Sequence, residues 1–191
     1  MKKYKETIPK EILFEIARES IKAFLTTKSI TDTSKYYKSY PKLKEKKGSF
    51  VTLYIDEQLK GCIGRLEGER SLADDISVNA IDAAFYDNRF PPLAEEEFIR
   101  LKIEISLLTK PEKFIYQTEE ELFKKIFENK YGVILKMGIN KSTYLPQVWE
   151  SYSNPQTFMR ELAFKGGFPD GVWNNKECEV FTYTAEVFSE N

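Results

Sequence analysis

Histidine is absent from this chain of 191 residues, and its absence removes several classes of active site. Histidine is the usual general base near neutral pH and the commonest protein ligand of catalytic metals. A histidine-dependent triad, a facial-triad iron centre and most catalytic zinc sites are therefore excluded within this chain. We predict no metal site and no cofactor.

Cysteine is scarce, and long apolar runs are missing. The two cysteines, Cys62 and Cys178, are too few for a disulfide framework, and their spacing matches no zinc signature. No apolar run approaches the roughly 18 residues that a membrane-spanning helix needs. The basic start, residues 1–5, is not followed by the apolar core of a signal peptide. We therefore expect a reduced, cytoplasmic protein that has no membrane partner.

An excess of either charge is also lacking. Lysine and arginine number 29 against 30 aspartates and glutamates, so no global field favours nucleic acid or an anionic membrane. Hydrophobic residues make up 41% of the chain, which is enough for a core without covalent cross-links. We expect one domain over residues 1–191, with a division into two lobes as the open alternative.

The periodicity of apolar residues predicts a mixture of helices and strands. Alternating runs indicate strands, and helical spacing with capping residues such as Ser71 and Thr118 indicates helices. The expected helices cover 9–27, 71–87, 118–129 and a segment from 155 that ends at 166–167. The expected strands cover 50–55, 58–66, 101–107, 131–137, 142–145 and 177–188. This order predicts an α+β fold with a mixed, largely antiparallel sheet and flanking helices.

Residues 28–47 have neither helical nor strand periodicity, and we predict a long surface loop there. The segment interleaves lysines with Tyr36, Tyr37 and Tyr40, as single-stranded nucleic-acid binders do with phosphate contacts and stacking. RNA binding is therefore one hypothesis for the protein. A solvated loop is the favoured interpretation, because the overall charge is near zero and no RNA-binding motif is present.

Cys62 lies between two glycines, Gly61 and Gly64, on a predicted strand. Glycine weakens a strand interior, so its presence indicates close approach by a ligand, a helix or a neighbouring backbone. The thiol could be a nucleophile or redox centre activated by nearby arginines or by the following helix. The competing interpretation, which we favour, is a small buried side chain, because free cysteine is among the most buried residue types.

Three polar residues follow that strand. Asn79 lies within an otherwise apolar helix, where its low helix propensity suggests a hydrogen-bonding role. Arg89 could hold a carboxylate or phosphate with its planar guanidinium, and Asp87 could accept a proton from an activated thiol. The favoured alternative is a local Asp87–Arg89 pair that fixes the following Phe-Pro-Pro turn.

Several ordered motifs together resemble the AMMECR family, named for the AMME chromosomal region. They include Gly48–Leu53, Leu59–Gly64, Asn79–Ala80, Ala83–Phe85, Asp87, Arg89–Leu93, Glu104–Ser106, Tyr131–Leu135, Leu145–Trp149 and Lys165–Gly167. The resemblance implies a compact α+β protein with a larger and a smaller lobe and a cleft between them. Lys60 stands where the family hallmark has arginine, which removes a planar fork at that position.

The resemblance also implies partners. Prokaryotic members are encoded beside, or fused to, a Memo-like protein that resembles non-haem-iron dioxygenases and a radical S-adenosylmethionine protein. Our leading hypothesis is an accessory module that binds a small ligand or a partner protein beside the Cys62 hairpin; the alternatives are a cysteine-dependent enzyme that uses Cys62 and an RNA-binding protein. The candidate ligand-binding residues are Lys60, Gly61, Gly64, Asn79, Asp87, Arg89 and Gln147.

Overall fold

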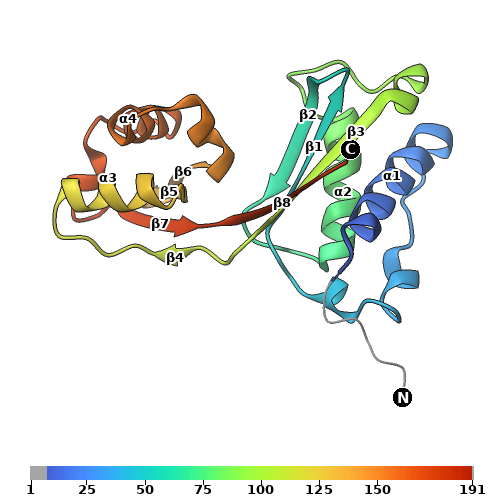
Figure 1. Ribbon diagram of the computed structural model, residues 1–191, viewed down its shortest axis with the longest axis horizontal. Coiled ribbons are helices and arrows are strands. Elements are labelled where there is room, and N and C mark those ends of the chain that lie inside the picture. Colours follow the sequence, from blue (N-terminus) through green and yellow to red (C-terminus); the bar gives the residue numbers. More distant parts are fainter. Residues whose placement is uncertain (1–7, 191) are drawn as a thin grey trace. The chain divides into compact units, whose positions relative to one another are not determined.

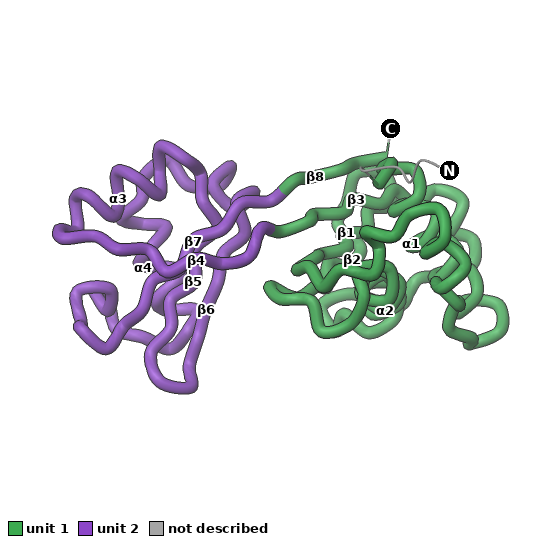
Figure 2. The backbone as a smooth tube through the Cα atoms, turned by 90° about the horizontal axis from the view of Figure 1, so that it is seen from below, with its two compact units in different colours: residues 1–108, 186–191 green, residues 109–185 purple. Residues whose placement is uncertain are grey.

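The computed structural model describes residues 8–190, so the basic start at residues 1–5 lies outside the described part. The chain divides into two compact units, which Figure 2 shows in different colours. Unit 1 contains the described residues up to Leu108 and those from Glu186 onward, and unit 2 is Thr109–Ala185. Each unit has its own hydrophobic core.

Unit 1 contains a four-stranded sheet, in which the strand order is β2-β1-β3-β8. The central strand β1 pairs with β2 and with β3 in antiparallel fashion. Two helices, α1 and α2, pack together against one face of this sheet (Figure 1). The elements of unit 1 are α1 Lys10–Thr27, β1 Ser49–Ile55, β2 Gln58–Arg65, α2 Leu72–Phe85, β3 Leu101–Leu108 and β8 Ala185–Ser189.

Alternation along β1 and β3 decides which side chains meet the helices. Val51, Leu53, Ile103 and Ile105 are at most 1% exposed and belong to the core that includes α1 and α2. Burial of each such side chain contributes roughly 1.5–3 kcal/mol. Because successive side chains of a strand point to opposite faces, Thr52 lies on the face of the sheet away from the helices.

The segment 28–47 is more ordered than a free surface loop. It forms two 3-10 turns, Thr33–Tyr36 and Pro41–Lys44, and Tyr36 and Leu43 are buried in the core of unit 1. Most of the other side chains of this segment are exposed, so it lies at the surface, while Tyr36 and Leu43 complete the packing around α1 and α2.

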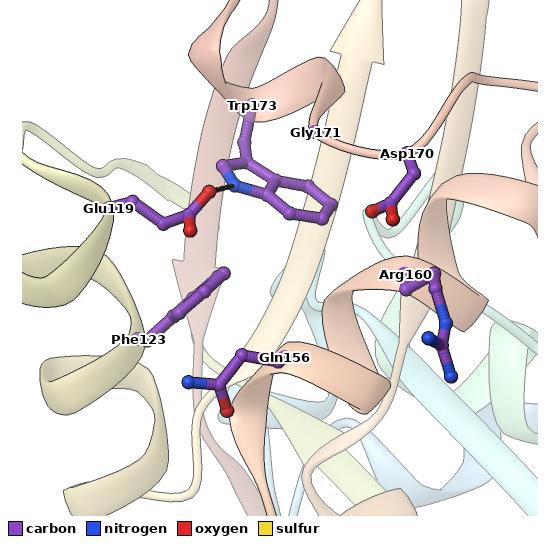
Figure 3. A pocket seen from close by; sticks show the side chains of 7 residues that line it. All are labelled: Glu119, Phe123, Gln156, Arg160, Asp170, Gly171 and Trp173. Carbon is purple, nitrogen blue, oxygen red and sulfur yellow. Dashed lines mark hydrogen bonds between the residues drawn. The ribbon is translucent and has the colours of Figure 1, made fainter.

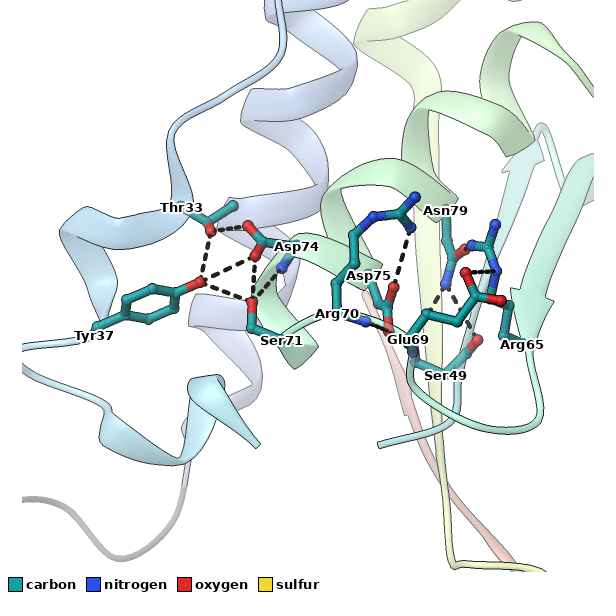
Figure 4. Close-up of polar contacts among 10 residues, drawn as sticks. All are labelled: Thr33, Tyr37, Ser49, Arg65, Glu69, Arg70, Ser71, Asp74, Asp75 and Asn79. Atoms are coloured by element: carbon teal, nitrogen blue, oxygen red, sulfur yellow. Dashed lines mark hydrogen bonds and ion pairs between the residues drawn. The ribbon is translucent and has the colours of Figure 1, made fainter. Parts of the chain in front are cut away.

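Tyr36 and Tyr37 of this segment are hydrogen-bonded inside unit 1. The Tyr36 hydroxyl donates to the carboxylates of Glu15 and Glu19, both at 2.9 Å. Tyr37 bonds to the start of α2 through Asp74, at 3.3 Å, and through the capping serine (Figure 4). Rings held in this way pack against protein, which does not favour their use as a stacking surface for RNA bases.

Unit 2 contains a second four-stranded sheet, in which the strand order is β4-β7-β5-β6 and every pair is antiparallel. Aromatic packing dominates its core, where the rings of Trp149 and Phe158 stack at 3.7 Å between centroids. The elements are β4 Glu112–Lys113, α3 Glu119–Glu128, β5 Gly132–Met137, β6 Asn140–Tyr144, α4 Pro155–Lys165 and β7 Glu179–Tyr183. The predicted α+β class with mainly antiparallel strands is confirmed.

The single strand predicted over 177–188 is wrong. The chain breaks at Thr184 into β7, in the sheet of unit 2, and β8, in the sheet of unit 1. Thr184 is held outside both sheets by Thr109: the Thr109 amide donates to the Thr184 carbonyl and the Thr184 amide to the Thr109 hydroxyl, both at 2.9 Å. Alternation of side chains continues through such a break, so the pattern alone did not reveal it.

Among residues 8–190, no helix combines the length and the apolar character needed to cross a membrane. In the same range, no three His, Cys, Asp or Glu side chains gather as a metal site would require.

Candidate functional site

A constellation of polar groups surrounds Cys62 on β2, the outer strand of the first sheet. The backbone amide of Cys62 donates to Asp87 Oδ2 at 2.9 Å, and Arg89 Nη2 donates to the Cys62 carbonyl at 3.1 Å. An edge strand normally presents such groups unpaired to any passing strand. The two side chains, here called the Asp87–Arg89 clamp, take the place of a neighbouring strand at this point.

The clamp is also internally paired. Arg89 Nε donates to Asp87 Oδ1 at 2.9 Å and Nη2 donates to Oδ2 at 2.6 Å. Together with the Cys62 amide, the Arg89 guanidinium holds the pKa of the Asp87 carboxyl well below its usual range. Both carboxylate oxygens accept strong hydrogen bonds, so Asp87 is poorly suited to take a proton from a thiol. The predicted local pair between Asp87 and Arg89 is confirmed. Both side chains also bond to the backbone of Cys62 on β2, which was not predicted.

The Cys62 thiol is half-buried. Burial raises its pKa, although a hydrogen bond from the Thr52 hydroxyl to Sγ at 3.3 Å acts in the opposite direction. An activated catalytic cysteine needs a lowered pKa and an electropositive environment. Burial therefore does not favour activation of the Cys62 thiol.

Cys62 belongs to a row of polar side chains that crosses the sheet. Thr52 pairs with Cys62 on one side and with Glu104 on the other, and the Ser189 hydroxyl donates to Glu104 Oε2 at 2.9 Å. The row therefore runs through β2, β1, β3 and β8 on the face opposite the helices. We call Cys62, Thr52, Glu104 and Ser189 the polar row.

Packing explains the two glycines beside Cys62. A Cβ added at Gly61 would lie 2.0 Å from the carbonyl oxygen of Ala83 on α2, and one at Gly64 would lie 2.3 Å from the Ser49 carbonyl on β1. Of the three causes considered from the sequence, a helix accounts for Gly61 and a neighbouring strand for Gly64. Alanines at positions such as Ala83 allow α2 to approach this closely.

Lys60 and Asn79 have structural partners of their own. Lys60 Nζ forms an ion pair with Glu97 at 2.7 Å, with side chains 11% and 22% exposed. A hydrogen bond from the Ala94 amide and the Lys60 ammonium lower the pKa of Glu97. Lys60 thus ties β2 to the 3-10 turn Glu95–Arg100.

The buried Asn79 amide donates to the Ser49 carbonyl and hydroxyl and accepts from Arg65 at 3.3 Å (Figure 4). This places Asn79 at the other end of the hairpin, where Ser49 pairs with Arg65, three residues beyond Cys62. Gln147, the remaining candidate, lies on the 3-10 turn Pro146–Ser151 of unit 2. The structure of unit 1 therefore brings together Cys62, Asp87 and Arg89, and not the full predicted set.

Thr52 and Glu104 were not among the predicted site residues. Alternation places each of them on the polar face of its strand, but it does not show that Thr52 lies opposite Cys62. Asp56 and Glu57, both with positive φ, form a two-residue hairpin turn of the kind that sets strand register. A bulge between Leu53 and Tyr54 then shifts the pairing by one residue. Without that bulge the register would pair Thr52 with Gly61, so counting from the turn misses the contact with Cys62.

Comparison with known proteins gives consistent matches over nearly the whole chain. The AMMECR1 family model matches residues 14–188. Protein MK0488 of Methanopyrus kandleri is 34% identical over 191 residues, covering 94% of this chain and 87% of its own length. Protein PH0010 of Pyrococcus horikoshii is 36% identical over 186 residues, with 94% and 89% covered.

The fold matches as well. The crystal structure of the uncharacterized protein PH0010 superimposes with a TM-score of 0.84 at 35% identity, covering 95% of this chain and 91% of that one. Sequence motifs, family model and fold agree over the same residues. The chain therefore belongs to the AMMECR1 family.

Proposed function

We propose that this protein is an accessory binding module, located in the cytoplasm, that acts with a Memo-like protein and a radical S-adenosylmethionine protein. The polar row on the first sheet is the surface that engages the partner. One observation carries this proposal: the Asp87–Arg89 clamp bonds both the amide and the carbonyl of Cys62, so the edge of the first sheet is closed beside the polar row. Two free cysteines fit a reducing compartment.

The alternative, a cysteine-dependent enzyme, is less well supported. Such an enzyme needs a thiolate and a base within hydrogen-bond reach. Burial raises the pKa of Cys62, and Asp87, the base considered from the sequence, is paired through both oxygens. A rigid edge with a polar row suits recognition, because a preorganised surface loses little entropy on binding.

Binding can be tested with the two partner proteins purified separately. We expect association of the full chain with at least one of them in titration calorimetry, and at least 10-fold weaker affinity for Glu104→Gln. The matched control is Glu128→Gln, which removes a charge from the exposed end of α3. Equal affinities for both variants, or no association with either partner, would contradict the proposal.

Thiol chemistry separates the two hypotheses. We expect the rate of alkylation of Cys62 by iodoacetamide to rise with pH along a titration curve whose midpoint lies above the ordinary thiol pKa of about 8.5. Cys178→Ser isolates Cys62 for this measurement, and Cys62→Ser isolates the second thiol, whose pKa is also raised by burial. A reactive Cys62 that titrates below pH 7 would instead favour the enzyme.

A further inference from the structure

The two sheets formed by residues 8–190 have four edge strands, β2, β8, β4 and β6, and two of these edges are closed by side chains. On β2, the Asp87–Arg89 clamp bonds the amide and the carbonyl of Cys62. On β6, Lys165 Nζ donates to the Thr143 carbonyl at 2.9 Å. Free backbone groups on an edge recruit further strands, and charged side chains placed there hinder such pairing.

The edge strand β4, in unit 2, is protected by its shortness. It consists of Glu112–Lys113 and directly follows Pro111. The chain then continues to α3, where the Glu119 carboxylate accepts a hydrogen bond from Trp173 Nε1 at 2.6 Å (Figure 3). Very short edges that contain lysine or adjoin proline are poor templates for pairing, so β4 offers little backbone to a further strand.

The remaining edge strand, β8, lacks these protections. Its sequence, Ala185–Ser189, contains no lysine, proline or glycine, and Val187 at its centre is 41% exposed. Among the described residues, no strand pairs with its outer side. β8 is therefore an open edge of the kind that pairs with another strand.

Two hydrogen bonds show which backbone groups of β8 point outward. The Thr184 carbonyl accepts from the Thr109 amide at 2.9 Å, and the Glu190 amide donates to the Ile103 carbonyl at 3.0 Å. Both bonds are made on the side of β3, and both involve even-numbered residues of this segment. The backbone groups of successive residues in a strand point to opposite sides. Those of the odd-numbered residues in 185–189 therefore point away from β3.

We propose that β8 pairs in antiparallel fashion with β8 of a second copy of this chain, around a two-fold axis at Val187 that is perpendicular to the sheet. This register uses every outward-pointing residue, because Val187 faces its own copy and Ala185 faces Ser189. The one charged residue of the strand, Glu186, then faces Phe188 of the second copy. No like charges lie opposite each other, so β8 is complementary to itself.

The pairing joins the two sheets into one continuous sheet. Ser189 belongs to the polar row, and alternation places Val187 on the same face of the sheet. A two-fold axis perpendicular to the sheet keeps both polar rows on one face. The pairing does not depend on the proposed function, because it is measured with this chain alone.

The association can be measured by sedimentation velocity of the full chain from micromolar to millimolar concentration. We expect the mean mass to rise from that of one chain toward that of two, with weak affinity because a short strand gives a small interface. Val187→Pro removes the outward amide at the axis and leaves the bonds to β3 in place. It should weaken dimerisation at least 10-fold, since it deletes the pair of hydrogen bonds across the axis. A wild-type chain that stays monomeric throughout would overturn the proposal.

A charge exchange at Val187 tests the two-fold arrangement whether or not Val187→Pro folds. Val187→Lys and Val187→Glu should each weaken self-association several-fold, because like charges then face each other, and an equimolar mixture of the two should regain dimers. The matched control is Leu59→Lys, at a side chain 40% exposed on β2 of the same sheet, which should dimerise like the wild type. Undiminished dimers of both charged variants, or a mixture that stays monomeric, would refute the pairing.

Discussion

At the residue scale, the Asp87–Arg89 clamp shows how a pair of charges can serve the backbone. The Asp87 side chain is only 3% exposed, whereas that of Arg89 is 56% exposed. Solvent screens an arginine at this position, so its attraction alone contributes little. Its importance lies in satisfying a buried carboxylate and an edge carbonyl, both of which would otherwise lose hydrogen bonds.

Arg89→Ala should therefore lower the free energy of unfolding by about 1–2 kcal/mol, because it leaves Asp87 buried without its partner. Urea denaturation followed by circular dichroism measures this change. The control, Arg100→Ala, breaks an ion pair between side chains that are 49% and 63% exposed and should cost no more than about 0.5 kcal/mol. Equal stabilities of the two variants would show that the clamp has no structural role.

At the scale of elements, the contact between β2 and α2 determines the geometry of the site. Gly61 brings the Ala83 carbonyl against the strand, and the Lys60–Glu97 pair fastens the same strand to a 3-10 turn. Lys60 replaces the arginine of the family hallmark, and its partner in this structure is the single carboxylate of Glu97. A lysine ammonium can serve one carboxylate in this position without bidentate geometry.

Gly61→Ala should be destabilising by about 1–3 kcal/mol or more, because the new methyl group meets backbone that cannot move aside. Thermal unfolding monitored by circular dichroism gives the measurement. Leu59→Ala, at a side chain 40% exposed on the same strand, is the control and should have a much smaller effect. A Gly61→Ala protein as stable as the wild type would contradict the observed approach of α2.

At the scale of the whole molecule, carboxylates with lowered pKa values predict the response of stability to acid. Hydrogen bonds from Arg89 and the Cys62 amide lower the pKa of Asp87, and those from the Ala94 amide and Lys60 lower that of Glu97. A depressed folded-state pKa contributes stability that is present above the unfolded value and is lost as pH falls through the folded value. Stability should therefore decrease below about pH 4–4.5.

Denaturation midpoints measured from pH 7 down to pH 3 should show this decrease. Asp87→Asn should start from a lower stability and show a shallower decline, since its side chain cannot bind a proton in this range. A wild-type curve that is flat over the interval, or an equal slope in the variant, would show that Asp87 does not contribute.

The division into two units predicts that the inserted one folds alone. Residues 109–185 have their own core, and their ends are joined by hydrogen bonds between Thr109 and Thr184. A fragment of these residues should give a cooperative thermal transition and a dispersed amide spectrum. Phe158→Ala, at a fully buried ring, should abolish the transition in the fragment. A fragment without cooperative unfolding would contradict this prediction.

The sequence by itself determined the local elements of this protein. Helix starts at Ser71, Thr118 and Asn154 were predictable because each cap bonds to an amide three residues along the chain. The hairpin around Asp56 and Glu57 was likewise predictable from its short turn. These features depend on neighbours in the chain, which a sequence displays directly.

The tertiary structure alone decided which residues meet. It set the one-residue shift that places Cys62 opposite Thr52, the approach of Ala83 to Gly61, and the break at Thr184 that assigns two halves of one pattern to different sheets. Each of these features depends on packing between different segments of the chain. The period of apolar residues along a strand is the same with or without a register shift or a break, so it does not reveal them. The family resemblance could be recognised from the sequence. The hydrogen-bond partners of Cys62 could not, because folding brings them together from distant parts of the chain.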